Sequence, residues 1–351
     1  MKKLLLIGSN TIHFWRYLKM IRNDFDVVTV ITTSQPKGIT FDQVDLSIMN
    51  FSFLNPISFS KTIKKIKKII RTFCPDIIHV HQANTVALAT LIASRGFKIP
   101  VILTAWGSDV LVVPNKGFFY REMVKYNLNH ATILSSDSLY MENKMRELVP
   151  DRCLDIRIAN FGIGIIPNPS IPKENIVYSN RSHKKLYRIE TIIIQFKNFI
   201  NSRKEPWRLL IAGIGPQTEK LKLLAKSLGI EDQIDFVGWL DAEKNALYYN
   251  KAMIYVSIPE SDATSISLLE AMACGCISVV SNIPANLEWI VNDLNGIVAD
   301  DLSSSFIERA LQLDMQLVKQ MNNFLIEKKG TVEVNHEKFL SIYNDVLKTE
   351  E

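Results

Sequence analysis

Two carboxylates in the second half of the chain stand at a spacing that could serve a phosphate-bearing substrate. Asp262 and Glu270 are separated by seven residues, and between them a loop gives way to good helix formers that end at Gly275. The first amides of a helix have no intrahelical acceptor, and the helix dipole makes that end electropositive. We therefore expect a phosphate at the start of this helix. The residues expected to hold it are Thr264, Ser265, Ile266 and Ser267.

The flanks of Glu270 are leucine, alanine and methionine, which predicts that its carboxylate is partly buried. A buried carboxylate needs hydrogen-bond partners, and the hydroxyls of a ribose would serve. Two simpler roles stay open, because Asp262 could only favour the helix dipole and Glu270 could pair with a neighbouring lysine.

This segment resembles the nucleotide-sugar motif of glycosyltransferase family 4, in which two acids separated by seven residues precede an Ala-Met-Ala-Cys-Gly run. The resemblance implies that Glu270 binds the ribose hydroxyls of the donor. It also implies that Asp262, which stands where the family usually has Glu, contacts hydroxyls of the donated sugar, and that the amides between the two acids hold the diphosphate. The family's Gly-Phe-Gly after the first acid is here Ala-Thr-Ser, at residues 263–265.

The resemblance extends to a basic segment that follows the apolar run at residues 175–179. Arg181 takes the place of the family's phosphate-binding arginine, since a guanidinium can hold two phosphate oxygens and stabilise the charge that grows on a leaving diphosphate. The family's lysine would fall near residue 186 or 187, and we take the nearby Lys185 for that role. A solvated basic turn is the alternative for Lys184, Lys185 and Arg188.

A glycine-containing turn carries a further match. The segment from residue 209 to 240 resembles the family's Gly-x-Gly-Pro turn, its following helix and its Phe-x-Gly strand end, which places Gly213, Gly215 and Gly238 at the donor. The first two glycines permit a tight turn, and Pro216 suits the first helical position. A dinucleotide site is disfavoured because Thr218 replaces the third glycine of that fingerprint.

In the first half of the chain, the resemblance indicates the acceptor side. A histidine commonly precedes Gly-Ser-Asp in the family, and Trp106 replaces it here, so histidine-based catalysis is not expected. We expect His81 and Trp106 near the acceptor. Asp109 either binds an acceptor hydroxyl as a catalytic residue or caps a helix. Gly8 and Ser9, which follow the first apolar run, are expected beneath the donor diphosphate.

The elements that must position these residues follow from the apolar pattern. Short, nearly continuous apolar runs alternate with segments of helical period, which predicts parallel sheets covered by helices on both faces. In such sheets, ligands bind beyond the carboxyl ends of the strands. The ten runs expected to form strands are KLLLIG, DVVTVIT, DIIHVH, VILTAW, ATILSS, NIVYSN, RLLIAG, QIDFVG, MIYVSI and ISVVS.

The pattern occurs twice, which predicts two domains that meet at a proline-rich segment. The resemblance identifies the pair as a GT-B fold, an α/β architecture of two Rossmann-like parallel-sheet domains facing across a cleft. We expect an acceptor-binding domain over residues 1–165 and a nucleotide-sugar-binding domain over residues 166–332. A C-terminal helix, residues 333–351, is expected to pack back on the first domain.

Composition and charge narrow the class of protein. The 351 residues are 47% hydrophobic and 22% charged, which is typical of ordered globular proteins. The net charge of +5 is too small to indicate nucleic-acid binding without a clustered basic and aromatic surface. No run is apolar enough to span a bilayer. The four cysteines form no CxxC pair, so neither a disulfide framework nor a metal site is expected, and a reducing cytoplasm fits best.

Basic charge is clustered once, in a segment of helical period where lysines alternate with isoleucines. Such a helix could lie on anionic lipid at the inner face of the membrane. It could equally cover the first sheet with its apolar face while the lysines stay in water. The basic residues are Lys61, Lys64, Lys65, Lys67, Lys68 and Arg71.

The resemblance therefore implies a retaining hexosyltransferase that needs no metal or other cofactor. Its donor would be a nucleotide diphosphate sugar, expected to be a UDP-sugar, and its acceptor a glycan or lipid-linked glycan in the assembly of a surface polysaccharide such as lipopolysaccharide. Two alternatives stay open. One is a catalytically silent nucleotide-sugar-binding or scaffold protein, since Trp106, Asp262 and the displaced lysine depart from the family pattern. The other is a nucleotide-sugar epimerase or phosphorylase on the same fold.

Overall fold

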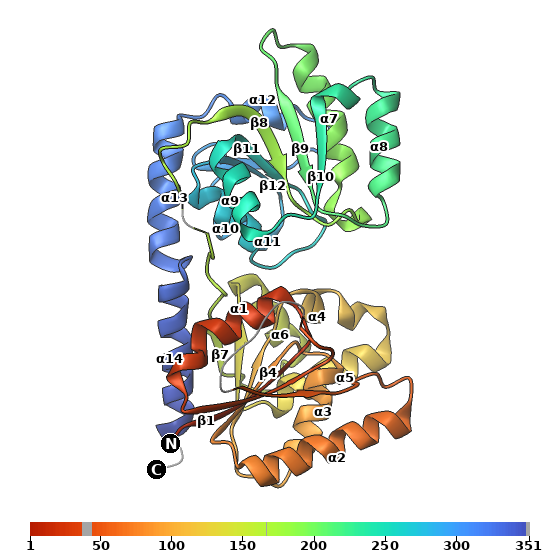
Figure 1. Cartoon of the computed structure of the whole chain (residues 1–351), viewed down its shortest axis with the longest axis vertical. Helices are drawn as coiled ribbons and strands as arrows, with labels where there is room; N and C mark the ends of the chain where they lie inside the picture. Colours follow the sequence, from red (N-terminus) through yellow and green to blue (C-terminus); the bar gives the residue numbers. More distant parts are fainter. Residues whose placement is uncertain (37–43, 166, 349–351) are drawn as a thin grey trace. The chain divides into compact units, whose positions relative to one another are not determined.

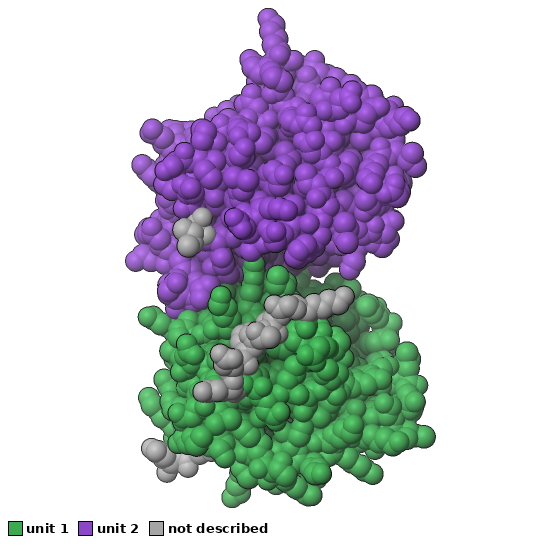
Figure 2. Space-filling view, in the orientation of Figure 1, with its two compact units in different colours: residues 1–161, 335–351 green, residues 162–334 purple. Residues whose placement is uncertain are grey.

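The computed structural model describes residues 1–36, 44–165 and 167–348 of the chain. The chain divides into two compact units, which Figure 2 colours separately: residues 1–161 with 335–351, and residues 162–334. Each unit contains one parallel sheet covered by helices (Figure 1). The predicted class, two Rossmann-like parallel sheets, is therefore confirmed.

The first unit is built on a seven-stranded parallel sheet in the order β3-β2-β1-β4-β5-β6-β7. Its strands are β1 (Lys3–Gly8), β2 (Val27–Thr32), β3 (Val44–Ile48), β4 (Ile77–His81), β5 (Val101–Thr104), β6 (Ile133–Ser136) and β7 (Ile156–Ile158). The central strands are apolar along their length because helices cover both faces of the sheet. Leu4, Leu5 and Leu6 of β1 are fully buried for this reason.

Helices on either side of this sheet complete the first unit. They are α1 (Ile12–Ile21), α2 (Pro56–Phe73), α3 (Thr85–Ser94), α4 (Ser108–Leu111), α5 (Phe118–His130), α6 (Leu139–Leu148) and α14 (Val332–Lys348), with the 3-10 turns η1 (Arg22–Asp24) and η2 (Val113–Lys116). Phe14 of α1 and Phe339 of α14 share one core cluster with the apolar side chains of β1. α14 belongs to this unit from Asn335 onward.

The lysine-rich segment forms α2, and its apolar face is already occupied. Thr62, Ile66 and Ile70 are buried, and α2 packs against α3, while Lys61 and Lys64 are exposed. This is the packing that the alternative predicts, in which the apolar face lies inside the protein and the lysines stay in water. A contact of this helix with lipid stays a prediction.

The second unit is built on a six-stranded parallel sheet in the order β10-β9-β8-β11-β12-β13. Its strands are β8 (Glu174–Ser179), β9 (Arg208–Ala212), β10 (Ile234–Gly238), β11 (Ala252–Ser257), β12 (Ile277–Ser281) and β13 (Gly296–Ala299). Its helices are α7 (Ile189–Asn201), α8 (Thr218–Ser227), α9 (Ala242–Lys251), α10 (Ile266–Ala273), α11 (Pro284–Leu287), α12 (Phe306–Ala310) and α13 (Met315–Lys329), with the turns η3 (Lys185–Tyr187) and η4 (Glu231–Gln233). Two core clusters lie in this unit, one involving α7, α8 and α12 and the other involving α9, α10 and α13.

All ten predicted strands are present, and three more were not predicted. β3, β7 and β13 each lie at an edge of a sheet. β3 and β7 carry polar residues among their apolar ones, as a strand that pairs on one side can, whereas β13 is apolar but only four residues long. β3, for example, reads Val-Asp-Leu-Ser-Ile.

Two histidines of β4 lie inside the first unit. His79 Nδ1 is 2.7 Å from the Tyr343 hydroxyl of α14, and His79 Nε2 is 2.7 Å from the Thr104 hydroxyl. Burial lowers the pKa of His79 to about 3. Burial and the neighbouring His79 also lower the pKa of His81. Both imidazoles are therefore neutral in the folded protein near pH 7.

A histidine that is neutral when folded and protonated when unfolded makes the folded state less stable as the pH falls below its ordinary pKa of 6.5. We expect the free energy of unfolding to fall by up to about 1.4 kcal/mol per pH unit for each such histidine below that pH. The variant His79→Gln removes one titrating group, so its slope between about pH 6.5 and pH 5 should be smaller than that of the parent chain by up to about 1.4 kcal/mol per pH unit. Urea unfolding across this range measures both slopes, and equal slopes would contradict the burial of a neutral His79.

Candidate functional site

The start of α10 carries the side chains expected to bind the donor. Ser265 is the N-cap residue, and the first hydrogen bond of the helix runs from the amide of Leu268 to the Ser265 carbonyl at 3.0 Å. The amides of Ile266 and Ser267 therefore precede the hydrogen-bonded turns. The Ser265 hydroxyl makes no capping bond to the helix and instead accepts from Arg181. A helix start of this kind suits an anion.

Arg181 reaches this helix start from the loop that follows β8. Its Nη2 donates to Asp262 Oδ2 at 2.6 Å, and its Nη1 donates to the Ser265 hydroxyl. The guanidinium also lies on the ring of Tyr187, 4.5 Å from the ring centroid. The Arg181 side chain is 11% exposed. Burial lowers the pKa of Arg181, but Asp262, Tyr255 and Tyr187 together outweigh burial and raise that pKa, so the guanidinium stays charged.

The glycines of the predicted turn allow the Arg181 loop to pass close by. A Cβ on Gly213 would lie 2.6 Å from the Arg181 carbonyl oxygen, and Gly213 also has a φ of +105°. A Cβ on Gly215 would lie 2.6 Å from the His183 carbonyl oxygen. Gly213 donates its amide to the carbonyl of Gly238 at 2.7 Å, which joins the ends of β9 and β10. These glycines therefore fix the position of the backbone loop that carries Arg181.

The turn between β9 and α8 differs from the prediction in its length. Pro216 was expected at the first helical position, but α8 begins at Thr218. The Thr218 side chain explains this later start, because its hydroxyl accepts from the Gly215 amide at 3.0 Å. This bond stabilises the turn over residues 215–218, and the helix begins only after it. The same hydroxyl is 2.8 Å from His183 Nδ1.

The basic residues after Arg181 lie on the surface. Lys184 and Lys185 are exposed, and Arg188 pairs with Glu260 at 3.5 Å. Tyr187, two residues beyond Lys185, is the side chain that contacts the Arg181 guanidinium. The structure thus places an aromatic ring where the family pattern predicts a lysine, and it keeps Lys185 in solvent.

Glu270 lies on the buried side of α10, as its apolar neighbours predicted. Its side chain is buried at 4% exposure. Burial raises the pKa values of Tyr178 and Tyr249, and the neighbouring Tyr255 and then the charge of Glu270 add to that rise. Asn180 joins this cluster, because it donates to the Tyr249 hydroxyl at 2.7 Å and accepts from the Tyr255 hydroxyl at 3.0 Å. The residue before Arg181 is therefore anchored by two buried tyrosines whose pKa values the charge of Glu270 also raises.

In the first unit, Asp109 has a structural role that neither expectation described. It is 3% exposed, its Oδ2 accepts from the Ala83 amide at 2.6 Å, and its Oδ1 accepts from the Trp106 amide at 3.0 Å. The N-cap residue of α4 is Gly107, so Asp109 is not a helix cap. Burial raises the pKa of Asp109, and its backbone hydrogen bonds oppose that rise. Asp109 ties the loop after β4 to the loop after β5.

His81 was expected near the acceptor, but it is fully buried. Its Nδ1 accepts from Trp106 Nε1 at 3.1 Å, and its ring packs at 4.5 Å from the Tyr17 ring and 5.6 Å from the Phe14 ring. His81 can therefore affect an acceptor only through Trp106, which is partly exposed. Gly8, also buried, is required here because a side chain would collide with the Phe14 ring.

Ser9 lies in a hollow at the carboxyl edge of the first sheet. The hollow has a volume of about 490 Å³ and includes Asn50, Ser52 and Asn84 among its lining residues. The Ser9 hydroxyl donates to Gln82 Oε1 at 2.6 Å, and Gln82 has a φ of +72°, which is unusual for a residue other than glycine. Hydroxyl and amide side chains of this kind can hydrogen-bond the hydroxyls of a sugar.

Two apolar residues at the carboxyl edge of the second sheet were not predicted. Ile214 follows Gly213 after β9, and Trp239 follows Gly238 after β10, with 60% and 68% of their surfaces exposed. The hydrogen bond from Gly213 to Gly238 brings these strand ends together. The sequence signal that could have revealed this surface is Trp239, because it directly follows Gly238, the glycine predicted to end a strand.

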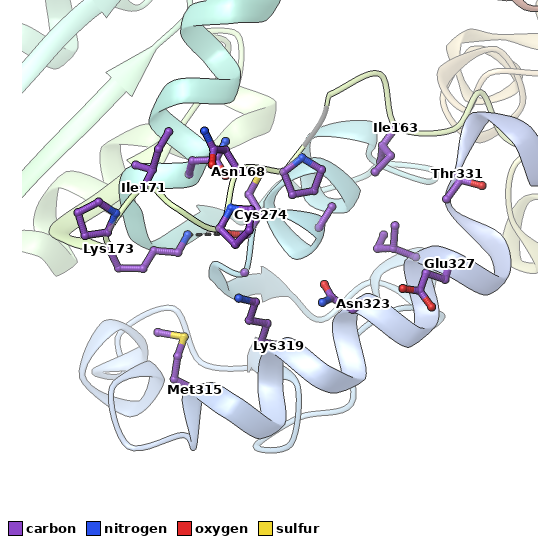
Figure 3. A pocket seen from close by; sticks show the side chains of 17 residues that line it. Ile163, Asn168, Ile171, Lys173, Cys274, Met315, Lys319, Asn323, Glu327 and Thr331 are labelled. Carbon is purple, nitrogen blue, oxygen red and sulfur yellow. Dashed lines mark hydrogen bonds between the residues drawn. The ribbon is translucent and has the colours of Figure 1, made fainter.

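A hollow of the second unit, of about 520 Å³, lies at the opposite end of α10 (Figure 3). Cys274 and Gly275 line it, together with residues of the segment 167–173 and of α13. Lys173 closes this end of the helix by donating to the Cys274 carbonyl at 2.8 Å. The eight residues of α10 separate this hollow from Arg181 by about 12 Å.

Within the described ranges, the side chains of His, Cys, Asp and Glu gather nowhere in a group of three that could hold a metal ion. No helix of the described part of the chain is long and apolar enough to cross a membrane.

Comparison with known proteins relates both units to one group of enzymes. Residues 2–138 match a family model described as glycosyl transferase 4-like, and residues 166–324 match one described as glycosyl transferases group 1. Alpha-monoglucosyldiacylglycerol synthase of Streptococcus pneumoniae is 25% identical over 73% of this chain and 61% of its own length. N-acetyl-alpha-D-glucosaminyl L-malate synthase of Bacillus anthracis is 24% identical over 78% of this chain and 75% of its own length. The chain thus spans less than two thirds of the first of these relatives.

A solved structure shows the same fold over nearly the whole chain. The HepE protein of Anabaena, described in complex with UDP, superposes with a TM-score of 0.77 and 11% sequence identity. The match covers 98% of this chain and 100% of that one.

The glycine contacts make a testable prediction about the Arg181 loop. Gly213→Ala would place a methyl group against the Arg181 carbonyl, so we expect nucleotide affinity to fall about tenfold or more together with a loss of stability of about 2 kcal/mol. Gly229→Ala is the matched control, because Gly229 also has a positive φ, +64°, but faces open space. It should lose roughly 1 kcal/mol of stability and keep its nucleotide affinity. Titration calorimetry with UDP and thermal unfolding measure both, and equal affinities of the two variants would refute the role of Gly213.

Proposed function

This chain belongs to the group 1 glycosyltransferases, family 4, with the GT-B fold that the sequence predicts, and we propose that it transfers a sugar from a UDP-sugar to a hydroxyl-bearing acceptor with retention of configuration. The observation that carries the proposal is the Arg181 guanidinium held at the start of α10 by Asp262 and Ser265. We take UDP as the nucleotide because the HepE protein, which shares this fold, is described in complex with UDP.

In the proposed reaction, the donor diphosphate lies between Arg181 and the amides of Ile266 and Ser267. As the bond from sugar C1 to the diphosphate oxygen breaks, negative charge grows on that oxygen, and the guanidinium and the helix dipole stabilise it. The acceptor oxygen bonds to C1 on the same face, and its proton passes to the leaving phosphate oxygen. Because fixed positive groups stabilise the leaving diphosphate, the proposed transfer needs no metal ion.

Asp262 orients the guanidinium and, in this proposal, a hydroxyl of the donated sugar. Its Oδ2 holds Arg181, its Oδ1 accepts from the Ala263 amide at 3.1 Å, and the side chain is 22% exposed. Each carboxylate oxygen of Asp262 already accepts one hydrogen bond, so a sugar hydroxyl would donate to an oxygen that also accepts from Arg181 or from the Ala263 amide. An aspartate reaches less far than glutamate, which restricts the position of that hydroxyl.

The nucleoside part of the donor is assigned to the neighbouring strand ends. Ile214 and Trp239 supply exposed apolar surface on which a base can stack. Glu270 is assigned to the ribose hydroxyls, since a carboxylate accepts two hydrogen bonds from a vicinal diol.

We assign the acceptor to the first unit, at the hollow that contains Ser9 and Asn84. Its mixture of hydroxyl and amide groups suits a glycan or a lipid-linked glycan, which agrees with a role in building a surface polysaccharide. The four cysteines are unpaired, which suits the reducing cytoplasm.

Replacing the key arginine tests the donor site. Arg181→Ala removes a charge-assisted contact worth about 1.5 to 3 kcal/mol, so kcat/KM for the donor should fall by roughly one to two decades or more. Arg208→Ala is the control, because Arg208 also forms an ion pair, with Asp235 at 2.5 Å, but is 50% exposed and lies at the opposite end of β9. Initial rates of donor consumption measure both variants. Unchanged kinetics for Arg181→Ala would reject the assignment of this residue.

The activity itself is tested with a panel of radiolabelled nucleotide sugars. We expect UDP-sugars to raise the unfolding temperature and one of them to be hydrolysed or transferred, at a rate that excess EDTA does not change. Binding without hydrolysis or transfer across the whole panel would favour the silent scaffold. Recovery of a rearranged or phosphorylated sugar without transfer would favour the epimerase or phosphorylase.

A further inference from the structure

One face of α13, at the edge of the second unit, carries apolar side chains that stand in water (Figure 1). Leu317 is 40% exposed, Phe324 is 59% exposed, and Met321 between them is partly exposed. The helix packs inside its unit through another face, on which Asn322 and Ile326 are buried. The exposed apolar side chains therefore do not hold α13 on its own unit.

The exposed face of α13 has the residue spacing of a coiled-coil seam. Leu317, Met321 and Phe324 are four and three residues apart, and Asp314 and Lys328 continue the same alternation at the two ends. Residues at this spacing lie on one stripe of a helix and can interdigitate with the stripe of a second helix. From residue 314 to residue 328 the stripe is about 21 Å long. We call these five residues the α13 seam.

The two charges of the α13 seam are opposite in sign and stand at opposite ends. Asp314 caps the helix through Oδ1, which accepts from the amides of Gln316 at 2.8 Å and Leu317 at 3.3 Å, so Oδ2 can accept from an ammonium group. Lys328 is exposed, and its Nζ lies 5.9 Å from the centroid of the Phe324 ring. Within one chain the two charges are too far apart to pair. A stripe that is acidic at one end and basic at the other is complementary to a copy of itself turned end to end.

Exposed apolar side chains beside α13 widen this surface. The segment 291–295 lies along the helix, because Asn295 donates to the Asn322 side chain at 2.9 Å. Asn295 also accepts from the amide of Val291 at 2.7 Å, which fixes the start of the segment. Val291 is 53% exposed and Leu294 is 38% exposed. Single exposed apolar residues are ordinary on a protein surface, but a group of them marks an interaction site.

We propose that the α13 seam binds the α13 seam of a second copy of this chain, with the two helices antiparallel. A two-fold axis through Met321 places Leu317 of each chain on the partner's Phe324, and Asp314 of each chain beside the partner's Lys328. The charge pattern favours this occupant, because one symmetry operation pairs both ends of the seam. A parallel pair would instead place acid on acid and base on base. The proposal does not depend on the reaction assigned above.

Analytical ultracentrifugation of the full chain tests the proposal. A seam of one helix is at the small end of specific interfaces, so we expect a dimer with a Kd of about 1 to 50 µM. The variant Leu317→Ser/Phe324→Ser should associate at least about tenfold more weakly, with an unchanged unfolding temperature because both side chains are exposed in the single chain. Leu223→Ser is the matched control, because Leu223 is 67% exposed on α8 of the same unit, and it should associate like the parent. A parent that stays monomeric at about 200 µM would overturn the proposal, and so would equal association of the double variant.

Charge reversal tests the antiparallel pairing separately. Lys328→Asp places two acids at each end of the pair and Asp314→Lys places two bases there, so each variant alone should associate about tenfold more weakly than the parent. An equimolar mixture of the two variants restores both opposite pairs and should form a heterodimer with nearly the parent's affinity. Because Asp314 also caps α13, the variant Asp314→Asn, which keeps a capping oxygen, should weaken association without lowering the unfolding temperature. A mixture that associates no better than either variant alone would overturn the proposal.

Discussion

Arg181 puts a positive charge beside the electropositive start of α10, where the Arg181 side chain is 11% exposed and Ser265 is buried. Such an arrangement is unfavourable unless negative charge lies between them. In the protein alone, the Asp262 carboxylate supplies one negative charge, and the Tyr187 ring and the Ser265 hydroxyl hold the guanidinium in place. The two positive groups exceed that single carboxylate, and a diphosphate would supply the missing negative charge.

The rest of the second unit keeps this charge in one position. Gly213 and Gly215 let the strand-to-helix turn after β9 pass against the backbone of residues 181–183, where any side chain would collide. Next to the arginine in the chain, Asn180 is hydrogen-bonded to the two buried tyrosines Tyr249 and Tyr255. A guanidinium fixed before the reaction needs little reorganisation when charge develops, which is how preorganised groups lower a barrier.

The sequence predicted those parts of the structure that depend on local pattern. Ten apolar strands and the spacing of Asp262 and Glu270 were visible because buried parallel strands and a helix start have distinct sequence patterns. β3 and β7 were missed because polar residues interrupt their apolar runs, and β13 was missed because its apolar run is short. The burial of His81, the backbone contacts of Asp109 and the contact of Tyr187 with Arg181 could not be predicted, since each depends on which loop packs beside which strand end.

A crystal structure of the full chain with UDP tests the central claim most directly. The account predicts that oxygens of the terminal phosphate lie within about 3.2 Å of the Arg181 guanidinium and of the amides of Ile266 or Ser267. A diphosphate bound elsewhere, with Arg181 still directed only to Asp262 and Ser265, would contradict it.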